Sequence, residues 1–209
     1  FQTAPDVSFG PRLAYPKGAH YDYDIESQII AAFVNFEWNL SEKTKLVTGI
    51  RGEKVNYEYE TNIEPGTKGR IQVSPNRDDD FTEFSPKLAI NHKLNDELAI
   101  FANYSRGNRA PQTTDLYRIQ SKQIPGGAKS EKLDSLEIGL RGNFSIFNLE
   151  LVGFNMRKEN YFFRDSQGFN VENGKTTHRG FEINFLAEFN KFFQIENSTS
   201  FAEHEYDFD

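Results

Sequence analysis

Residues 28–40 read QIIAAFVNFEWNL, the longest regular alternation of apolar residues in the chain. Because alternate side chains of a strand point to opposite faces, one face carries six apolar residues: Ile30, Ala32, Val34, Phe36, Trp38 and Leu40. The other face ends in Asn35, Glu37 and Asn39. Strands of soluble proteins usually contain about 5–6 residues, whereas a tilted strand needs about 9–11 to cross a membrane. The stretch therefore predicts a membrane-crossing β-strand, with Trp38 at the membrane–water interface.

Further segments along the chain alternate in the same way. The clearest is LEIGLRGNF, residues 136–144, in which the charged Glu137 and Arg141 lie on the polar face. Charges at alternate positions are typical of a strand that faces a water-filled barrel interior. Residues 46–60 alternate less regularly, and the slip near Gly52 suggests a β-bulge. The whole chain predicts an all-β fold, an antiparallel meander of about eight long amphipathic strands in four hairpins.

The connections between these strands fall into two groups. Short turns are expected near residues 42, 95, 146 and 190, and long loops over residues 61–80, 107–133 and 164–175. Short turns on one rim and long loops on the other are typical of outer-membrane barrels. Two other architectures with similar strands stay open at this point: a small closed eight-stranded barrel acting as a passive pore or adhesin, and a soluble β-sandwich that binds a partner.

Composition narrows the function classes. The chain has no Cys, which excludes disulfides, thiolate metal sites and cysteine nucleophiles. A net charge of -7 with scattered basic residues argues against nucleic-acid binding. A hydrophobic fraction of 37% with 14% aromatic residues fits strands that have one apolar and one wet face. No apolar run approaches the roughly 18 residues of a membrane helix.

Several motifs lie in a characteristic order along the chain. They are FSPKLAINHKL (84–94), LAIFANYSRGNRAPQTTDLY (98–117), SEKLDSLEIGLRG (130–142) and FNVENGKTTHRGFEINF (169–185). This order resembles the C-terminal barrel of TonB-dependent outer-membrane receptors. That family typically has a Pro-led strand, a Tyr-Ser-x-Gly-x-Arg-Ala-Pro element, an acidic residue before the next strand, Glu-x-Gly, and then Asn-x-Gly followed by Arg-Gly-x-Glu. The matching residues are Pro86, Tyr104 to Pro111, Glu131, Glu137 to Gly139, Asn173, Gly174, Arg179, Gly180 and Glu182.

The resemblance implies a 22-stranded barrel in the bacterial outer membrane, filled by an N-terminal plug. Such receptors take up scarce ligands, often ferric siderophores or cobalamin, with energy passed from the inner membrane through the TonB protein. They contact lipid and lipopolysaccharide, and they are not enzymes. Residues 1–209 lack the plug and the TonB box, and eight strands cannot close a 22-stranded barrel. We therefore expect the chain to be a partial barrel domain, an internal fragment of the C-terminal barrel.

Loop 107–133 is the candidate ligand-binding segment. Its basic residues would attract an anionic ferric chelate; alternatively, Pro111 rigidifies the loop and the charges are ordinary surface residues. The candidate ligand-binding residues are Arg109, Gln112, Tyr117, Arg118 and Lys122.

Charged residues on the polar faces of the strands are the candidate lumen-facing wall: Glu37, Arg51, Glu137, Arg141 and Glu182. They would form cross-strand pairs that solvate the wall and hold the plug, or else contact the substrate. The four His residues lack metal-ligand spacing. No nucleophile elbow is present either, so we expect no metal site, no cofactor and no catalysis.

Overall fold

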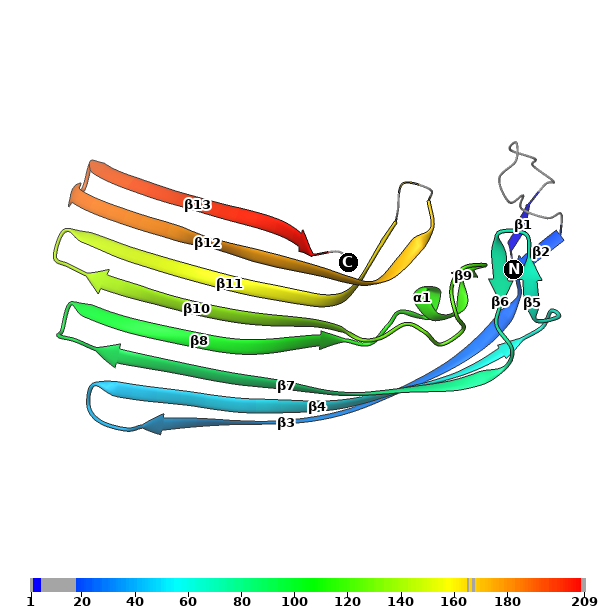
Figure 1. Cartoon of the computed structure of the whole chain (residues 1–209). Coiled ribbons are helices and arrows are strands. Elements are labelled where there is room, and N and C mark those ends of the chain that lie inside the picture. The colour runs from blue at the N-terminus through cyan, green and yellow to red at the C-terminus, as the bar shows by residue number, and fades with distance from the viewer. Residues whose placement is uncertain (1, 5–17, 165, 167, 208–209) are drawn as a thin grey trace.

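The computed structural model describes residues 2–4, 18–164, 166 and 168–207, and its main feature is one eight-stranded antiparallel sheet (Figure 1). Each strand pairs with the next one of the sheet along the chain, so the sheet is a meander of four hairpins, as the sequence predicted. The strands are β3 (Tyr23–Asn39), β4 (Thr44–Thr61), β7 (Arg77–Lys93), β8 (Leu98–Arg109), β10 (Glu131–Asn143), β11 (Phe147–Arg164), β12 (Asn170–Asn190) and β13 (Phe193–Asp207).

The four hairpin turns lie at one end of the sheet and the longer connections lie at the other, which we call the loop end (Figure 1). This confirms the predicted sorting of turns and loops, but the predicted third loop, residues 164–175, was too long: β11 ends at Arg164 and β12 begins at Asn170. The loop end also carries the small elements: β1 (Gln2–Ala4), β2 (Gly18–Tyr21), β5 (Gly66–Lys68), β6 (Ile71–Val73), α1 (Thr113–Tyr117) and β9 (Ile119–Gln120). No helix in the described part of the chain is long and apolar enough to cross a membrane.

Two local predictions were wrong, for one physical reason. The bulge suggested near Gly52 is absent, because β4 pairs without a register shift with both β3 and β7. The acidic run at residues 78–80, expected in a loop, lies inside β7. Both segments belong to strands that continue beyond the apolar band. In β4 the apolar residues change there from the outer face to the inner face, at Val55, Tyr57 and Tyr59, and in β7 residues 77–80 are charged on both faces, so no regular alternation marks either segment.

The sheet has two chemically different faces. We define the outer face as the one that carries Ile30, Phe36 and Trp38, together with their cross-strand partners. On this face many large apolar side chains are exposed: Ile50, Phe84, Leu88, Ile100, Leu136, Ile138, Leu151, Phe181 and Phe201. Exposed apolar surface this extensive is unusual for a soluble protein and marks a face that is covered in the cell; we call it the apolar band.

The apolar band runs diagonally across the hydrogen-bonded rows of the sheet. On β13, the last apolar residue of the band toward the loop end is Phe201. The residue of β3 in the same cross-strand row as Phe201 is Trp38. On β3, however, the band continues to Ile30, eight residues beyond Trp38. Eight residues over seven strand steps correspond to a strand tilt of about 38°, given a rise of about 3.3 Å and a spacing of about 4.8 Å. Transmembrane barrels have tilts of about 35–45°.

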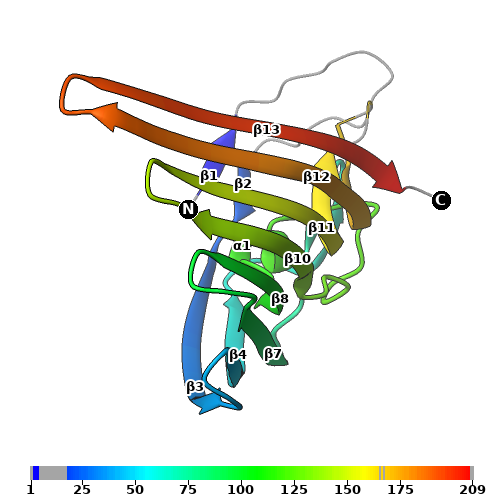
Figure 2. The same ribbon diagram turned by 90° about the vertical axis from the view of Figure 1, so that its left-hand side faces the viewer.

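The sheet is open. Within the described residues, β3 and β13 each pair with one neighbouring strand of the sheet, and they do not pair with each other. Seen from the hairpin-turn end, the sheet curves (Figure 2). An open curved sheet fits neither a closed eight-stranded barrel nor the two facing sheets of a sandwich. It is the geometry of a section of a larger barrel wall.

Candidate functional site: the loop end of the inner wall

Loop 107–133 folds back over the inner face of the sheet, the face opposite the apolar band. Leu116 and Tyr117 of helix α1 are fully buried, and the ring of Tyr117 stacks on Tyr59 of β4 with centroids 4.3 Å apart. Ala128 completes the buried cluster. Partly buried apolar residues surround it: Tyr23, Ile25, Tyr57, Phe81 and Phe162. The loop is therefore held by a small hydrophobic core of its own, built on the barrel wall.

A partly buried polar triad fixes the end of α1 to the wall. The hydroxyl of Tyr117 donates to a carboxylate oxygen of Asp79, at 2.9 Å. Arg77 donates to both oxygens of the same carboxylate, at 2.7 and 2.6 Å. Burial and the hydrogen bond to Asp79 raise the pKa of Tyr117 above its ordinary value. A carboxylate paired with an Arg is a strong hydrogen-bond acceptor, so this triad orients the helix as well as holding it.

The three long loops form one structure. Strand β6 of the first loop pairs with β9 of the second. The side chain of Gln120, in β9, then reaches the third loop: it accepts from the backbone N–H of Asn170 at 2.8 Å and donates to the carbonyl of Gly168 at 3.2 Å. Gln123 donates to Glu172 at 2.8 Å. Segments about 50 residues apart in the sequence are thereby joined above the inner wall.

The five candidate ligand-binding residues lie along this loop assembly. Arg109 pairs with Glu131 at 2.9 Å at the base of the loop, and Gln112 is exposed just before α1. Arg118 is exposed, with its Nε bonded to the Tyr23 hydroxyl at 3.0 Å. Lys122 lies 4.0 Å above the ring of Phe169. Tyr117, by contrast, is buried and serves the packing of the loop. Ligand contact by these residues stays a prediction.

The five candidate wall residues all lie on the inner face, but not together. Arg141, Glu137 and Glu182 surround a hollow of about 220 Å³. Arg141 pairs with Glu150, and Glu137 accepts a hydrogen bond of 3.4 Å from Asn103. Glu37 and Arg51 lie on β3 and β4, where they pair with Lys45 and Glu53. Four of the five thus have polar partners on the inner face, and their role toward plug or ligand stays a prediction.

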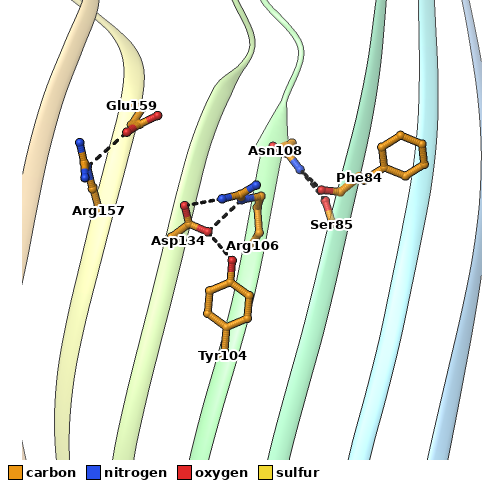
Figure 3. A network of polar contacts seen from close by, with 8 residues as sticks. All are labelled: Phe84, Ser85, Tyr104, Arg106, Asn108, Asp134, Arg157 and Glu159. Carbon is orange, nitrogen blue, oxygen red and sulfur yellow. Dashed lines mark hydrogen bonds and ion pairs between the residues drawn. The ribbon is translucent and has the colours of Figure 1, made fainter.

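A polar rim borders the apolar band on the outer face (Figure 3). Asp134 accepts two hydrogen bonds from Arg106, at 2.8 and 2.9 Å, and one of 2.7 Å from the hydroxyl of Tyr104. On the neighbouring strand, β11, Arg157 pairs with Glu159. These ion pairs border the apolar band on the side of the loop end.

The backbone pairing between β7 and β8 ends within the polar rim, before either strand reaches the loop end. The last pair joins Lys87 to Ser105. Beyond it, the side-chain amide of Asn108 donates to the carbonyl of Phe84 at 2.8 Å and to the hydroxyl of Ser85 at 3.0 Å (Figure 3). A side chain thus replaces backbone pairing where the two strands diverge toward the loops.

One inner-face contact was not predicted. His178 and His204 face each other across β12 and β13, with Nδ1 directed at Nδ1. Their 26-residue separation gives no spacing motif, so only the strand register could have revealed the pair. Within the described residues, no group of three or more His, Cys, Asp or Glu side chains is arranged to hold a metal ion.

Comparison with known proteins gives a consistent result. A family model described as "TonB dependent receptor-like, beta-barrel" matches residues 2–209. No curated protein sequence matches the chain. Among solved structures, the copper transporter OprC has a TM-score of 0.70 at 17% identity, covering 87% of this chain and 30% of its own. The ferric-catecholate import receptor Fiu from K12 E. coli has a TM-score of 0.67 at 18% identity, covering 97% of this chain and 31% of its own.

The ferric yersiniabactin uptake receptor FyuA from Yersinia pestis is similar to the same extent, with a TM-score of 0.68 at 14% identity, covering 88% of this chain and 28% of its own. The chain therefore spans about 30% of the length of the first of these solved structures. At such low identity the likeness concerns the fold.

Proposed function

The chain belongs to the TonB-dependent receptor β-barrel family, and from that membership we propose that it serves the uptake of a scarce ligand such as a ferric siderophore. TonB-dependent receptors are bacterial outer-membrane proteins and not enzymes, and this chain is part of such a barrel. In the proposed function, residues 1–209 are one partial barrel domain. A plug domain and the TonB protein of the inner membrane are its partners in transport.

The observation that carries this proposal is the joined loop assembly above the polar inner wall. Loop 107–133 is held on the wall by a hydrophobic cluster, is joined to the first loop by the pairing of β6 with β9, and reaches the third loop through Gln120. The three loops therefore form a preorganised surface. Preorganisation lowers the entropic cost of binding a ligand. Exposed Arg118 and Lys122 add positive charge to that surface, and positive charge raises the association rate of an anionic metal chelate.

The solved structures of similar fold support a metal or metal-chelate ligand as a class. By their names, OprC transports copper, and Fiu and FyuA take up ferric catecholate and ferric yersiniabactin. The exposed basic residues of the loop favour the anionic ferric chelates within that class. We propose further that the apolar band contacts lipid, and that the Arg residues of the polar rim contact phosphates of lipopolysaccharide.

Uptake by whole cells tests the proposal. Cells that express the protein should accumulate an iron-labelled siderophore only when TonB is present. A double variant, Arg118→Ala with Lys122→Ala, should raise the KM for uptake about tenfold, which corresponds to about 1.4 kcal/mol of lost binding. The matched control is Lys191→Ala, in the last hairpin turn at the opposite end of the sheet. Uptake that is the same with and without TonB for a panel of siderophores would overturn the proposal.

A further inference from the structure

Three residues with nitrogen or sulfur donors lie in one row on the inner face. Met156 of β11 is directly opposite His178 of β12, and His178 is directly opposite His204 of β13. Met156 is the single methionine of the chain. Residues directly opposite each other on one face have Cβ atoms about 4.5–5.5 Å apart. We propose that Met156, His178 and His204 form a copper-binding site.

The two imidazoles are arranged as a chelating pair. Their Nδ1 atoms are in contact, and the rings are tilted by 66° with centroids 4.7 Å apart. One of the two Nδ1 atoms therefore carries the hydrogen that the pair shares, and a metal ion that displaces this hydrogen would bind both imidazoles. The other nitrogen of His178, Nε2, is 2.9 Å from the hydroxyl of the buried Thr176. A partner on the far ring nitrogen fixes the orientation of a metal-binding His.

The donor set selects the metal. A thioether and two imidazoles are soft and borderline ligands, which suit copper, whereas Mg²⁺ and Ca²⁺ require oxygen ligands. Across β11, β12 and β13 the neighbouring rows of the inner face add no carboxylate, and Glu137 lies further along one of them, on β10. They consist of Phe154, Gly180 and Ala202 on one side, and of Lys158, Thr176 and Tyr206 on the other. The unbranched thioether side chain of Met156 has three rotatable bonds and can adapt to the ion.

The row lies where an ion can reach it. Arg179, next to His178 in β12, points to the outer face and pairs with Glu203 at 2.9 Å, so the row lies just beyond the apolar band. Met156 and His178 are partly exposed on the inner face, and His204 is exposed. A copper ion can therefore bind from the water-filled side of the wall. The site consists of wall residues only, so copper binding here does not depend on whether the protein takes up a siderophore.

Copper titration of the protein purified from outer membranes in detergent tests the site. We expect one Cu²⁺ per chain, with an electron paramagnetic resonance spectrum showing coupling to two imidazole nitrogens. His178→Asn and His204→Asn should each remove that spectrum. Thr176→Val, which takes away only the orienting hydroxyl, should weaken binding about 10- to 100-fold. Under reducing conditions, competition with a chromophoric chelator should show that Met156→Leu weakens Cu⁺ binding about tenfold and Cu²⁺ binding less.

A matched control is available on the other face of the wall. His92 contacts the hydroxyl of Thr44 at 2.8 Å, as His178 contacts Thr176, so His92→Asn should leave copper binding unchanged. Heat-dependent migration on gels verifies that each variant is folded. The wild-type spectrum tests the proposal even if a variant does not fold. A wild type without two-nitrogen coupling, or full binding in folded His178→Asn or His204→Asn, would overturn it.

Discussion

Removing the hydroxyl of Tyr117 should loosen the loop assembly without affecting the barrel. In Tyr117→Phe the ring still stacks on Tyr59, but Asp79 loses one of its three hydrogen bonds. A hydrogen bond to a charged group contributes about 1.5–3 kcal/mol. Opening of the loop should become easier by that amount. Because exchange through local opening follows the opening free energy, amide hydrogens of α1 should exchange about 10- to 100-fold faster.

The natural comparison is Tyr104→Phe. The hydroxyl of Tyr104 also donates to a carboxylate, that of Asp134, which accepts from Arg106 as well. This group lies on the polar rim of the outer face, where it is partly exposed. Water can replace that hydroxyl, so exchange in α1 should stay at the wild-type rate. Hydrogen–deuterium exchange with mass spectrometry, on protein in detergent, measures both variants. Equal exchange of α1 in Tyr117→Phe and wild type would refute the idea that the partly buried triad holds the loop.

Three further outcomes are expected. Ile138→Arg places a charge in the apolar band and should lower the free energy of unfolding in lipid by about 2–4 kcal/mol, whereas the neighbouring inner-face Glu137→Arg should change it much less; urea titration of both decides. Gln120→Leu should detach the third loop, so that amides of residues 168–172 exchange faster than in wild type; unchanged exchange would exclude the joined assembly. Glu58→Gln should raise stability at low salt by about 0.2–1 kcal/mol, because Glu58 lies between two other carboxylates in one cross-strand row; a loss of stability would argue against repulsion.

The sequence was sufficient where one face of a strand is apolar and the other polar. Over residues 28–40 and 136–144 the alternation predicted the strands and also which residues face outward. The alternation did not predict the parts of the strands that extend beyond the apolar band. In β7 both faces are charged there, so the pattern no longer separates a strand from a loop, and Asp79 was assigned to a loop although it lies within β7.

The candidate site was less predictable because it depends on register. The hydrophobic periodicity of loop 107–133 gave no sign that Tyr117 is buried on Tyr59, about 58 residues earlier. The pairing of His178 with His204 likewise follows from the register of β12 and β13, and a shift by one residue would place them on opposite faces. Sequence reasoning thus located the loop but not the side chains that its folding brings together.

If these strands form a tilted membrane wall, one face contacts lipid and the other contacts water. Single Cys residues introduced along β3 and β12, in a chain that has none, can be spin-labelled and tested for contact with lipid-soluble and water-soluble relaxants. Lipid contact should alternate with a two-residue period, and it should extend to Ile30 on β3 but stop at Phe181 on β12. Lipid contact that lacks this alternation, or that ends on the same hydrogen-bonded row in both strands, would contradict the account.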